Sequence, residues 1–253
     1  MKIIILTILF LVQHLTYSHY KIEYEYTLGT MTASVKIKSY LYTDGKKSKF
    51  VKDQVVNGKS ESEMQNVSTA VLDKIKSLNI KEPGDSIGYV IIKTMDSDTI
   101  NSRLLNSKGE YVKIVEANNP IVEIFSEYKS IFDYKCQKAI INYGERIFEV
   151  WFTEEIPLSD GPWKLKGLPG LILSAKTIDG FHQFLIQKVS NSQQYKNEFF
   201  AFPFTQVLSK ESYVSDYLRE FEKRFKYRKS KASVGATIKA SINNLDLPLT
   251  NLE

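Results

Sequence analysis

The stretch Gly161-Pro-Trp-Lys-Leu-Lys-Gly-Leu-Pro-Gly-Leu-Ile-Leu173 combines three glycines, two prolines and a tryptophan with the start of an apolar strand. Glycine reaches φ values that other residues avoid, and proline fixes its own φ. We therefore expect special φ values at Gly167 and Gly170, followed by a strand buried on both faces. The segment is predicted to form a corner that sets the curvature of a sheet, with Trp163 filling one end of the core. The residues of this corner that could also offer a binding surface are Gly161, Pro162, Trp163, Gly167, Leu168, Pro169, Gly170, Leu171 and Ile172.

On both sides of this stretch, short segments alternate polar and apolar residues and are separated by turn residues. This pattern is typical of an antiparallel sheet and not of βαβ units. The clearest hairpins are 134–143 with 146–152, around Gly144, and 170–177 with 181–189, around Gly180. Further strands are predicted over 20–26, 33–43, 48–56, 87–95, 100–105 and 111–117.

Two segments have helical spacing. Within 57–84, apolar residues from 67 to 78 recur at roughly the interval of a short amphipathic helix. Between 209 and 231, Ser209 is a candidate N-cap and one apolar stripe runs over about five turns. We expect this stripe to dock on the sheet, which leaves the basic face either in solvent or against anionic headgroups or an acidic partner. The stripe consists of Tyr213, Tyr217, Phe221 and Phe225.

These patterns predict a mainly β (α+β) fold: a single curved antiparallel sheet or incomplete barrel with a C-terminal amphipathic helix. Residues 19–231 are predicted to form one β-rich domain, and residues 232–253 a weakly ordered tail. With 43% hydrophobic residues, the chain can build a sizeable core.

The N-terminus has the form of a secretory signal. Lys2 precedes an apolar run over 3–12, and small residues at 16 and 18 suit a cleavage site. The run is shorter than the roughly 20 residues that span a bilayer, so a signal peptide over 1–18 is favoured over an N-terminal anchor. The mature chain is expected to be exported: periplasmic or outer-membrane-associated, or secreted, without a transmembrane helix. The net charge of +5 is too small to argue for nucleic acid.

The sequence offers few groups for catalysis. It lacks a Gly-x-Ser-x-Gly motif, and only His19 and His182 remain once the signal is removed. Cys136 is the only cysteine, so an internal disulfide is excluded, and its apolar neighbours predict a buried packing residue. If cleavage follows Ser18, the α-amine and imidazole of His19 would form a copper chelate, with His182 as the second imidazole.

Carboxylates near the two tryptophans allow one further interpretation. Glu154, Glu155 and Asp160 lie close in sequence to Trp151 and Trp163, as in a carboxylate pair with sugar-stacking rings. No spacing fixes their geometry, so a solvated loop rim is the favoured interpretation. We therefore predict no catalytic residue, metal or cofactor, and an enzyme is not expected.

A family resemblance follows from these motifs. Gly167-Leu-Pro-Gly-Leu-Ile172 matches the signature after which the GLPGLI family of exported Bacteroidetes proteins is named. The strand around Cys136, Val150-Trp-Phe-Thr153 and Gly161-Pro-Trp163 also resemble that family. The resemblance covers roughly residues 20–230, is weakest over 57–120, and implies no activity. The chain ends Leu-Pro-Leu-Thr-Asn-Leu-Glu, unlike the short Asn-Pro-Ile-Glu-like ending of many members.

A Gly-Leu-Pro turn that opens a strand, followed by a hairpin, also resembles periplasmic outer-membrane lipoprotein carriers. That similarity implies a curved sheet around an apolar cavity. The favoured function is an exported, non-catalytic envelope protein that binds an apolar small molecule, lipid or peptide in its curved sheet. The alternative is a protein-interaction accessory of an outer-membrane assembly or transport system, acting through residues 161–173 or the basic helix. An envelope hydrolase is the third hypothesis. Peripheral membrane contact stays open, and nucleic acid is not expected as a partner.

Overall fold

The computed structural model describes residues 19–29, 34–53, 87–231, 240–242 and 250–252. Twelve of the described strands form one open sheet in the order β12-β6-β5-β4-β3-β2-β1-β11-β10-β9-β8-β7, and β13 and β14 pair separately. Neighbours in the large sheet are antiparallel except for β12 and β6. The elements are β1 (Tyr20–Gly29), β2 (Ser34–Thr43), β3 (Lys47–Lys52), β4 (Val90–Thr94), β5 (Thr99–Leu105), β6 (Tyr111–Ala117), β7 (Ile121–Ile131), β8 (Tyr134–Tyr143), β9 (Arg146–Thr153), β10 (Leu171–Thr177), β11 (His182–Asn191), the 3₁₀ turn η1 (Asn197–Phe200), β12 (Val207–Ser209), α3 (Lys210–Lys231), β13 (Ala240–Ile242) and β14 (Thr250–Leu252).

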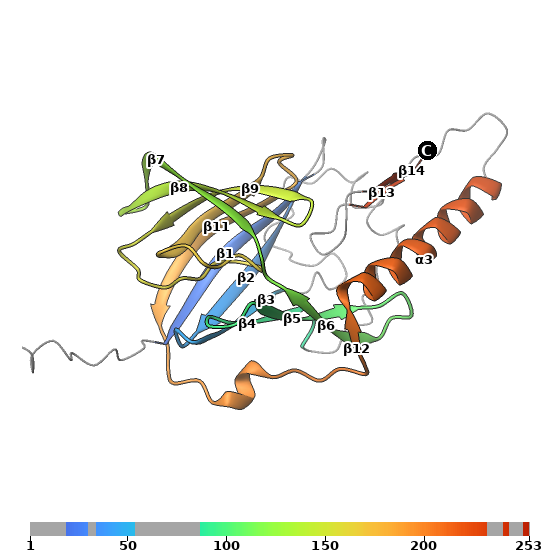
Figure 1. The fold of residues 1–253 in the computed structure, drawn as a ribbon, viewed down its shortest axis with the longest axis horizontal. Helices are drawn as coiled ribbons and strands as arrows, with labels where there is room; N and C mark the ends of the chain where they lie inside the picture. The colour runs from blue at the N-terminus through green and yellow to red at the C-terminus, as the bar shows by residue number, and fades with distance from the viewer. Residues whose placement is uncertain (1–18, 30–33, 54–86, 232–239, 243–249, 253) are drawn as a thin grey trace, which may run out of the picture.

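The predicted fold class is confirmed. Figure 1 shows a strongly curved sheet in which β7–β9 stand over β3–β6, with β1, β2 and β11 joining the two ends. Hairpin turns form where the sequence predicted them, with left-handed backbone angles at Gly144 (φ 61°) and Gly180 (φ 75°). The helix expected within 57–84 and the end of the strand predicted over 48–56 lie outside the described residues, as do residues 1–18 and most of the predicted tail.

Four of the described strands were not predicted: the three-residue strands β12, β13 and β14, and the much longer β7. β7 follows Pro120 directly, where the sequence Ile121-Val-Glu-Ile-Phe125 has β-branched residues but no clear alternation. It forms the last strand of the sheet beyond β8. Its alternation is hidden because most of its side chains are exposed, so burial did not impose a pattern on the sequence.

The helix α3 begins and docks as expected. The Ser209 hydroxyl accepts a hydrogen bond from the Ser212 N–H at 3.2 Å, which is an N-cap contact. Tyr213 is 3% exposed and packs in one cluster with Leu104, Val112 and Ile114 of β5 and β6. The apolar stripe therefore fastens the first turns of α3 to the β6 end of the sheet. None of the described helices has the length and apolar character needed to cross a membrane.

The outer face of β3–β5 is covered by the connection from β11 to β12. Phe200, within η1, packs against Val90 and Ile92, whose side chains lie opposite to the core-facing Ile91. The Arg103 guanidinium donates to the carbonyl of Pro203 at 2.8 Å and holds the later part of the connection. This covering layer gives that part of the sheet a second packed face.

Candidate functional site

The predicted corner lies inside the curve of the sheet. Residues 154–170 connect β9 to β10, and their buried side chains join the core cluster that also contains Tyr24 of β1 and Phe50 of β3. Of the nine corner residues, only Gly167 and Pro169 are exposed. The corner therefore offers little surface for a partner. The buried members are Gly161, Pro162, Trp163, Leu168, Gly170, Leu171 and Ile172.

Gly167 and Gly170 of the motif are glycines for different structural reasons. Gly167 has φ 97°, which confirms its predicted left-handed backbone. The same prediction for Gly170 is wrong: its φ is not in the left-handed region. A Cβ at Gly170 would overlap the Thr153 carbonyl oxygen, so this glycine allows the corner to approach the end of β9. The strand that follows is buried on both faces, as predicted.

Trp163 fills the core near β8 and β9. Its side chain is 2% exposed, although its backbone has φ 54°. Its ring lies edge-on to Tyr143 with centroids 4.9 Å apart and is 5.5 Å from the ring of Phe148. A left-handed backbone at a non-glycine residue costs about 1–2 kcal/mol, which the burial of a tryptophan can offset.

A buried ion pair ties the inner segment to the opposite part of the sheet. The Lys93 Nζ of β4 lies 2.5 Å from the Asp160 carboxylate, and both side chains are at most 2% exposed. The same Nζ donates hydrogen bonds to the carbonyls of Gly161 at 2.5 Å and Leu165 at 3.2 Å. Burial lowers the pKa of the Lys93 ammonium, and the charge of Asp160 opposes that shift.

Two lysines of the motif itself, Lys164 and Lys166, are also buried. Lys164 forms a buried ion pair with Glu116 of β6. Lys166 donates to the carbonyls of Thr94 at 2.8 Å and Ser97 at 2.5 Å, in the turn between β4 and β5. The inner segment is thus fixed by apolar packing on the β8–β10 side and by charged contacts on the β4–β6 side. We refer to residues 154–170 as the plug from here on.

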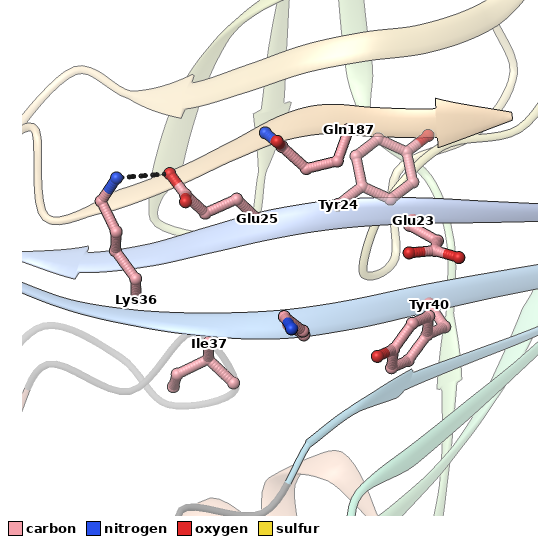
Figure 2. A pocket seen from close by; sticks show the side chains of 8 residues that line it. Glu23, Tyr24, Glu25, Lys36, Ile37, Tyr40 and Gln187 are labelled. Carbon is pink, nitrogen blue, oxygen red and sulfur yellow. Dashed lines mark ion pairs between the residues drawn. The ribbon is translucent and has the colours of Figure 1, made fainter. Parts of the chain in front are cut away.

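The plug occupies the space inside the curved sheet, where the resemblance to lipoprotein carriers predicted an apolar cavity. Elsewhere on the part of the chain that the structure describes, two surface hollows have volumes of about 180 and 200 Å³, below the roughly 300 Å³ at which sites for drug-sized ligands begin. Figure 2 shows the first, where Lys36 of β2 reaches Glu25 of β1 at 2.9 Å. Its rim is charged and exposed, and the second hollow lies beside Phe200 and Phe204. The second hollow has a mostly apolar lining, but neither hollow has the volume expected of a lipid site.

The three carboxylates that the sequence placed near the tryptophans, Glu154, Glu155 and Asp160, do not share one environment. Asp160 is buried in its ion pair with Lys93, so the expectation of a solvated loop rim is wrong for this residue. Glu154 and Glu155 are exposed, as that expectation requires, and Glu155 accepts the backbone N–H of Lys135 at 2.8 Å. Each of these contacts fixes the fold locally.

The two histidines lie at opposite ends of the β1–β11 pair. His182 pairs with Leu28, while His19 accepts the Ser192 N–H at its carbonyl beside the start of β1. At about 3.3 Å per residue they are roughly 30 Å apart, so the copper site with two imidazoles is wrong. His182 is buried, with its Nδ1 2.8 Å from the Tyr26 hydroxyl. Within the described ranges, no group of three or more His, Cys, Asp or Glu side chains could hold a metal ion.

Among the residues that the structure describes, β7 carries the most exposed large apolar side chains of any strand. Ile121 is 71% exposed, Ile124 47% and Tyr128 54%. Ile124 lies opposite the buried Ala139, on the core side of the sheet, and Ile121 lies opposite Asn142 on the outer side. Apolar side chains are therefore exposed on both faces of the same strand, and among the described residues no strand pairs with its other edge.

A bulge divides this edge. The register steps from Ile124–Ala139 to Tyr128–Gln137, so β7 carries extra residues at 125–127. The Gln137 side chain donates to the freed Phe125 carbonyl at 2.8 Å, and Lys138 pairs with Glu127 at 3.0 Å. The edge consequently presents one regular stretch on each side of the bulge, 121–124 and 128–131.

Comparisons with known proteins agree with part of the resemblance. A family model described as "Protein of unknown function (Porph_ging)" matches residues 142–174. This span runs from the end of β8 through β9 and the plug into β10, and it contains the signature at 167–172. The family resemblance is supported there. No curated protein matches the chain.

Among solved structures, PNGF-II in a C2 crystal form is 17% identical, with 90% of this chain and 35% of that chain covered and a TM-score of 0.50. This chain thus spans about a third of PNGF-II, and the likeness concerns the fold alone. An uncharacterized conserved protein from Thermus thermophilus is 8% identical, with coverages of 81% and 98% and a TM-score of 0.38. A LolA superfamily protein from Nitrosomonas europaea is 7% identical, with coverages of 74% and 91% and a TM-score of 0.32.

Proposed function

We propose that this chain is an exported, non-catalytic protein of the cell envelope that binds an extended peptide segment of a partner protein along β7. The observation that carries the proposal is the exposed apolar edge of β7. The signal-like residues 1–18 support export. The signature at 167–172, on which the chain resembles a family of exported proteins, also favours export.

The filled interior favours a peptide over an apolar small molecule. Buried ion pairs with β4 and β6 hold the plug in place. Moving the plug would separate Asp160 from Lys93 and leave the Lys93 charge without its counterion. A ligand inside the curve would have to displace this segment. A peptide at the sheet edge displaces nothing, because it adds a strand beyond β7.

Strand addition matches the chemistry of this edge. An edge strand presents backbone N–H and C=O groups that a second extended chain can pair with, and alternate side chains supply selectivity. Ile121 on the outer face and Ile124 on the inner face would both be covered by an added strand. We therefore expect the bound segment to carry apolar side chains opposite 121–124, on both of its faces.

Site-specific crosslinking tests the proposal. A photoreactive phenylalanine analogue in place of Tyr128 should give a discrete adduct in intact cells, whereas the same analogue at Tyr40, on the outer face of β2, should not. Ile124→Lys should abolish the Tyr128 adduct, because a charge at an edge strand opposes further pairing. Gln187→Lys, an exposed position away from β7, serves as the matched control. Equal adducts from both positions, or an adduct indifferent to Ile124→Lys, would count against strand addition.

A further inference from the structure

The positive charge of this chain is concentrated in one short stretch. Residues 223–231, Lys-Arg-Phe-Lys-Tyr-Arg-Lys-Ser-Lys, hold six basic residues and no acidic one, while the whole chain has a net charge of +5. The remainder is thus close to neutral. Such a local excess is the feature that recognises an anionic partner.

This stretch forms the last turns of α3 and lies beyond its docking site. The residues that pack on β5 and β6 end at Phe221. Figure 1 shows the C-terminal half of α3 running away from the sheet. The side chains of Lys223, Arg224, Lys226 and Tyr227 are exposed there, and Tyr227 is 65% exposed.

The exposed residues form one face. Lys223, Tyr227 and Lys231 follow at intervals of four residues and so lie in line along the helix, with Lys226 beside them. The buried Phe225, two residues from both Lys223 and Tyr227, lies on the opposite side. The Lys231 Nζ is 5.9 Å from the centre of the Tyr227 ring. The carboxylate of Glu220, almost one turn earlier, lies 3.9 Å from the Lys223 Nζ, which is a weak contact.

We propose that this face of α3, made of Lys223, Lys226, Tyr227 and Lys231, binds an anionic phospholipid surface. Lysines on flexible stems suit a layer of mobile headgroups, and tyrosine favours the boundary between headgroups and acyl chains. A nucleic acid is the weaker fit, since the net charge of the whole chain is only +5 and the remainder outside this stretch is close to neutral. This lipid-binding face of α3 is independent of the proposed peptide binding at β7. The helix docks at the β6 end of the sheet, and β7 is the last strand at the other end.

Vesicle binding measures the effect. The purified full chain should co-sediment with phosphatidylcholine vesicles that contain phosphatidylglycerol and not with pure phosphatidylcholine. Binding should weaken as salt is added. A lysine near an anionic surface contributes about a five-fold gain in affinity, so Lys223→Gln, Lys226→Gln and Lys231→Gln together should lower binding by roughly 100-fold.

A charge-matched variant provides the control. Lys108→Gln, Lys176→Gln and Lys188→Gln remove three exposed lysines outside α3, and this variant should bind within about two-fold of the original chain. Unchanged circular dichroism and thermal midpoint would show that both triple variants fold. Equal binding to pure phosphatidylcholine, equal losses in the two triple variants, or binding to a DNA duplex without binding to phosphatidylglycerol vesicles would each overturn the proposal.

Discussion

The ammonium of Lys93 and the carboxylate of Asp160 lie 2.5 Å apart, joining β4 to the plug inside the curve of the sheet. Both side chains are buried, at 0% and 2% exposed. A buried pair of this kind often adds little net stability compared with apolar residues. Breaking it is costly, because the remaining charge stays buried without its counterion. Both residues are therefore needed to hold the plug in place.

We predict that Lys93→Met lowers the free energy of unfolding by about 3–5 kcal/mol, because the Asp160 carboxylate loses its partner. Asp160→Leu should have a similar effect. The double variant should cost clearly less than the sum of the two, since no charge is then left alone. Urea unfolding of all four proteins gives the coupling free energy directly. Additive losses would show that the two residues do not act as a pair.

A second prediction separates the two glycines of the signature. Gly170→Ala should destabilise the protein by about 4 kcal/mol or more, because its Cβ would overlap the Thr153 carbonyl and only a shift of β9 or β10 could relieve the overlap. Gly167→Ala meets no atom within 4 Å and should cost only about 1–2 kcal/mol for its positive φ. Thermal unfolding distinguishes the two. Similar losses would mean that backbone angle, and not close approach, governs this corner.

The elements that sequence predicted best are those with one buried face. β1 alternates because every second residue from Ile22 to Tyr26 enters the core, and α3 repeats every fourth residue because Tyr213 and its neighbours dock on β6. β7 lacks this constraint, so it was missed. Its exposed side chains nevertheless make it the leading surface for a partner.

The interior of the sheet was harder to predict. Lys164, Lys166 and Asp160 have the composition of a solvated loop, and burial of such residues depends on partners far away in the chain. Glu116 and Lys93 become those partners only through the register of β4 and β6. No local spacing connects them with the plug. The resemblance to lipoprotein carriers therefore led to the expectation of an open cavity.

The single cysteine provides a third prediction. The Cys136 side chain is buried, and burial raises the pKa of its thiol. The thiolate is the reactive form, so a thiol reagent should label the native protein far more slowly than a free cysteine. In urea, labelling should reach one thiol per chain at the rate of a free cysteine. Rapid labelling of the native state would show that the β8 end of the sheet opens readily.

The last prediction concerns stability in alkali. Tyr24 is 1% exposed and its hydroxyl donates to the Ile172 carbonyl at 2.8 Å. Burial, aided by the charge of Asp160, raises its pKa well above the ordinary value of 10.0. Above pH 10 the unfolded chain therefore loses a proton that the folded chain keeps. The contribution of Tyr24 to stability is fully present below that pH and falls by about 1.4 kcal/mol per pH unit above it.

Tyr24→Phe isolates this contribution, because other titrating groups affect both proteins alike and cancel in the difference. Burial also lowers the pKa of Lys93, which acts in the opposite direction and stays common to both. Near neutral pH the variant should be less stable by about 1 kcal/mol, since the Ile172 carbonyl loses its donor. Roughly one pH unit above 10 the two stabilities should cross, and the variant should then be the more stable protein. Urea unfolding across this range measures the crossing, and parallel curves would show that the Tyr24 hydroxyl ionises in the folded protein.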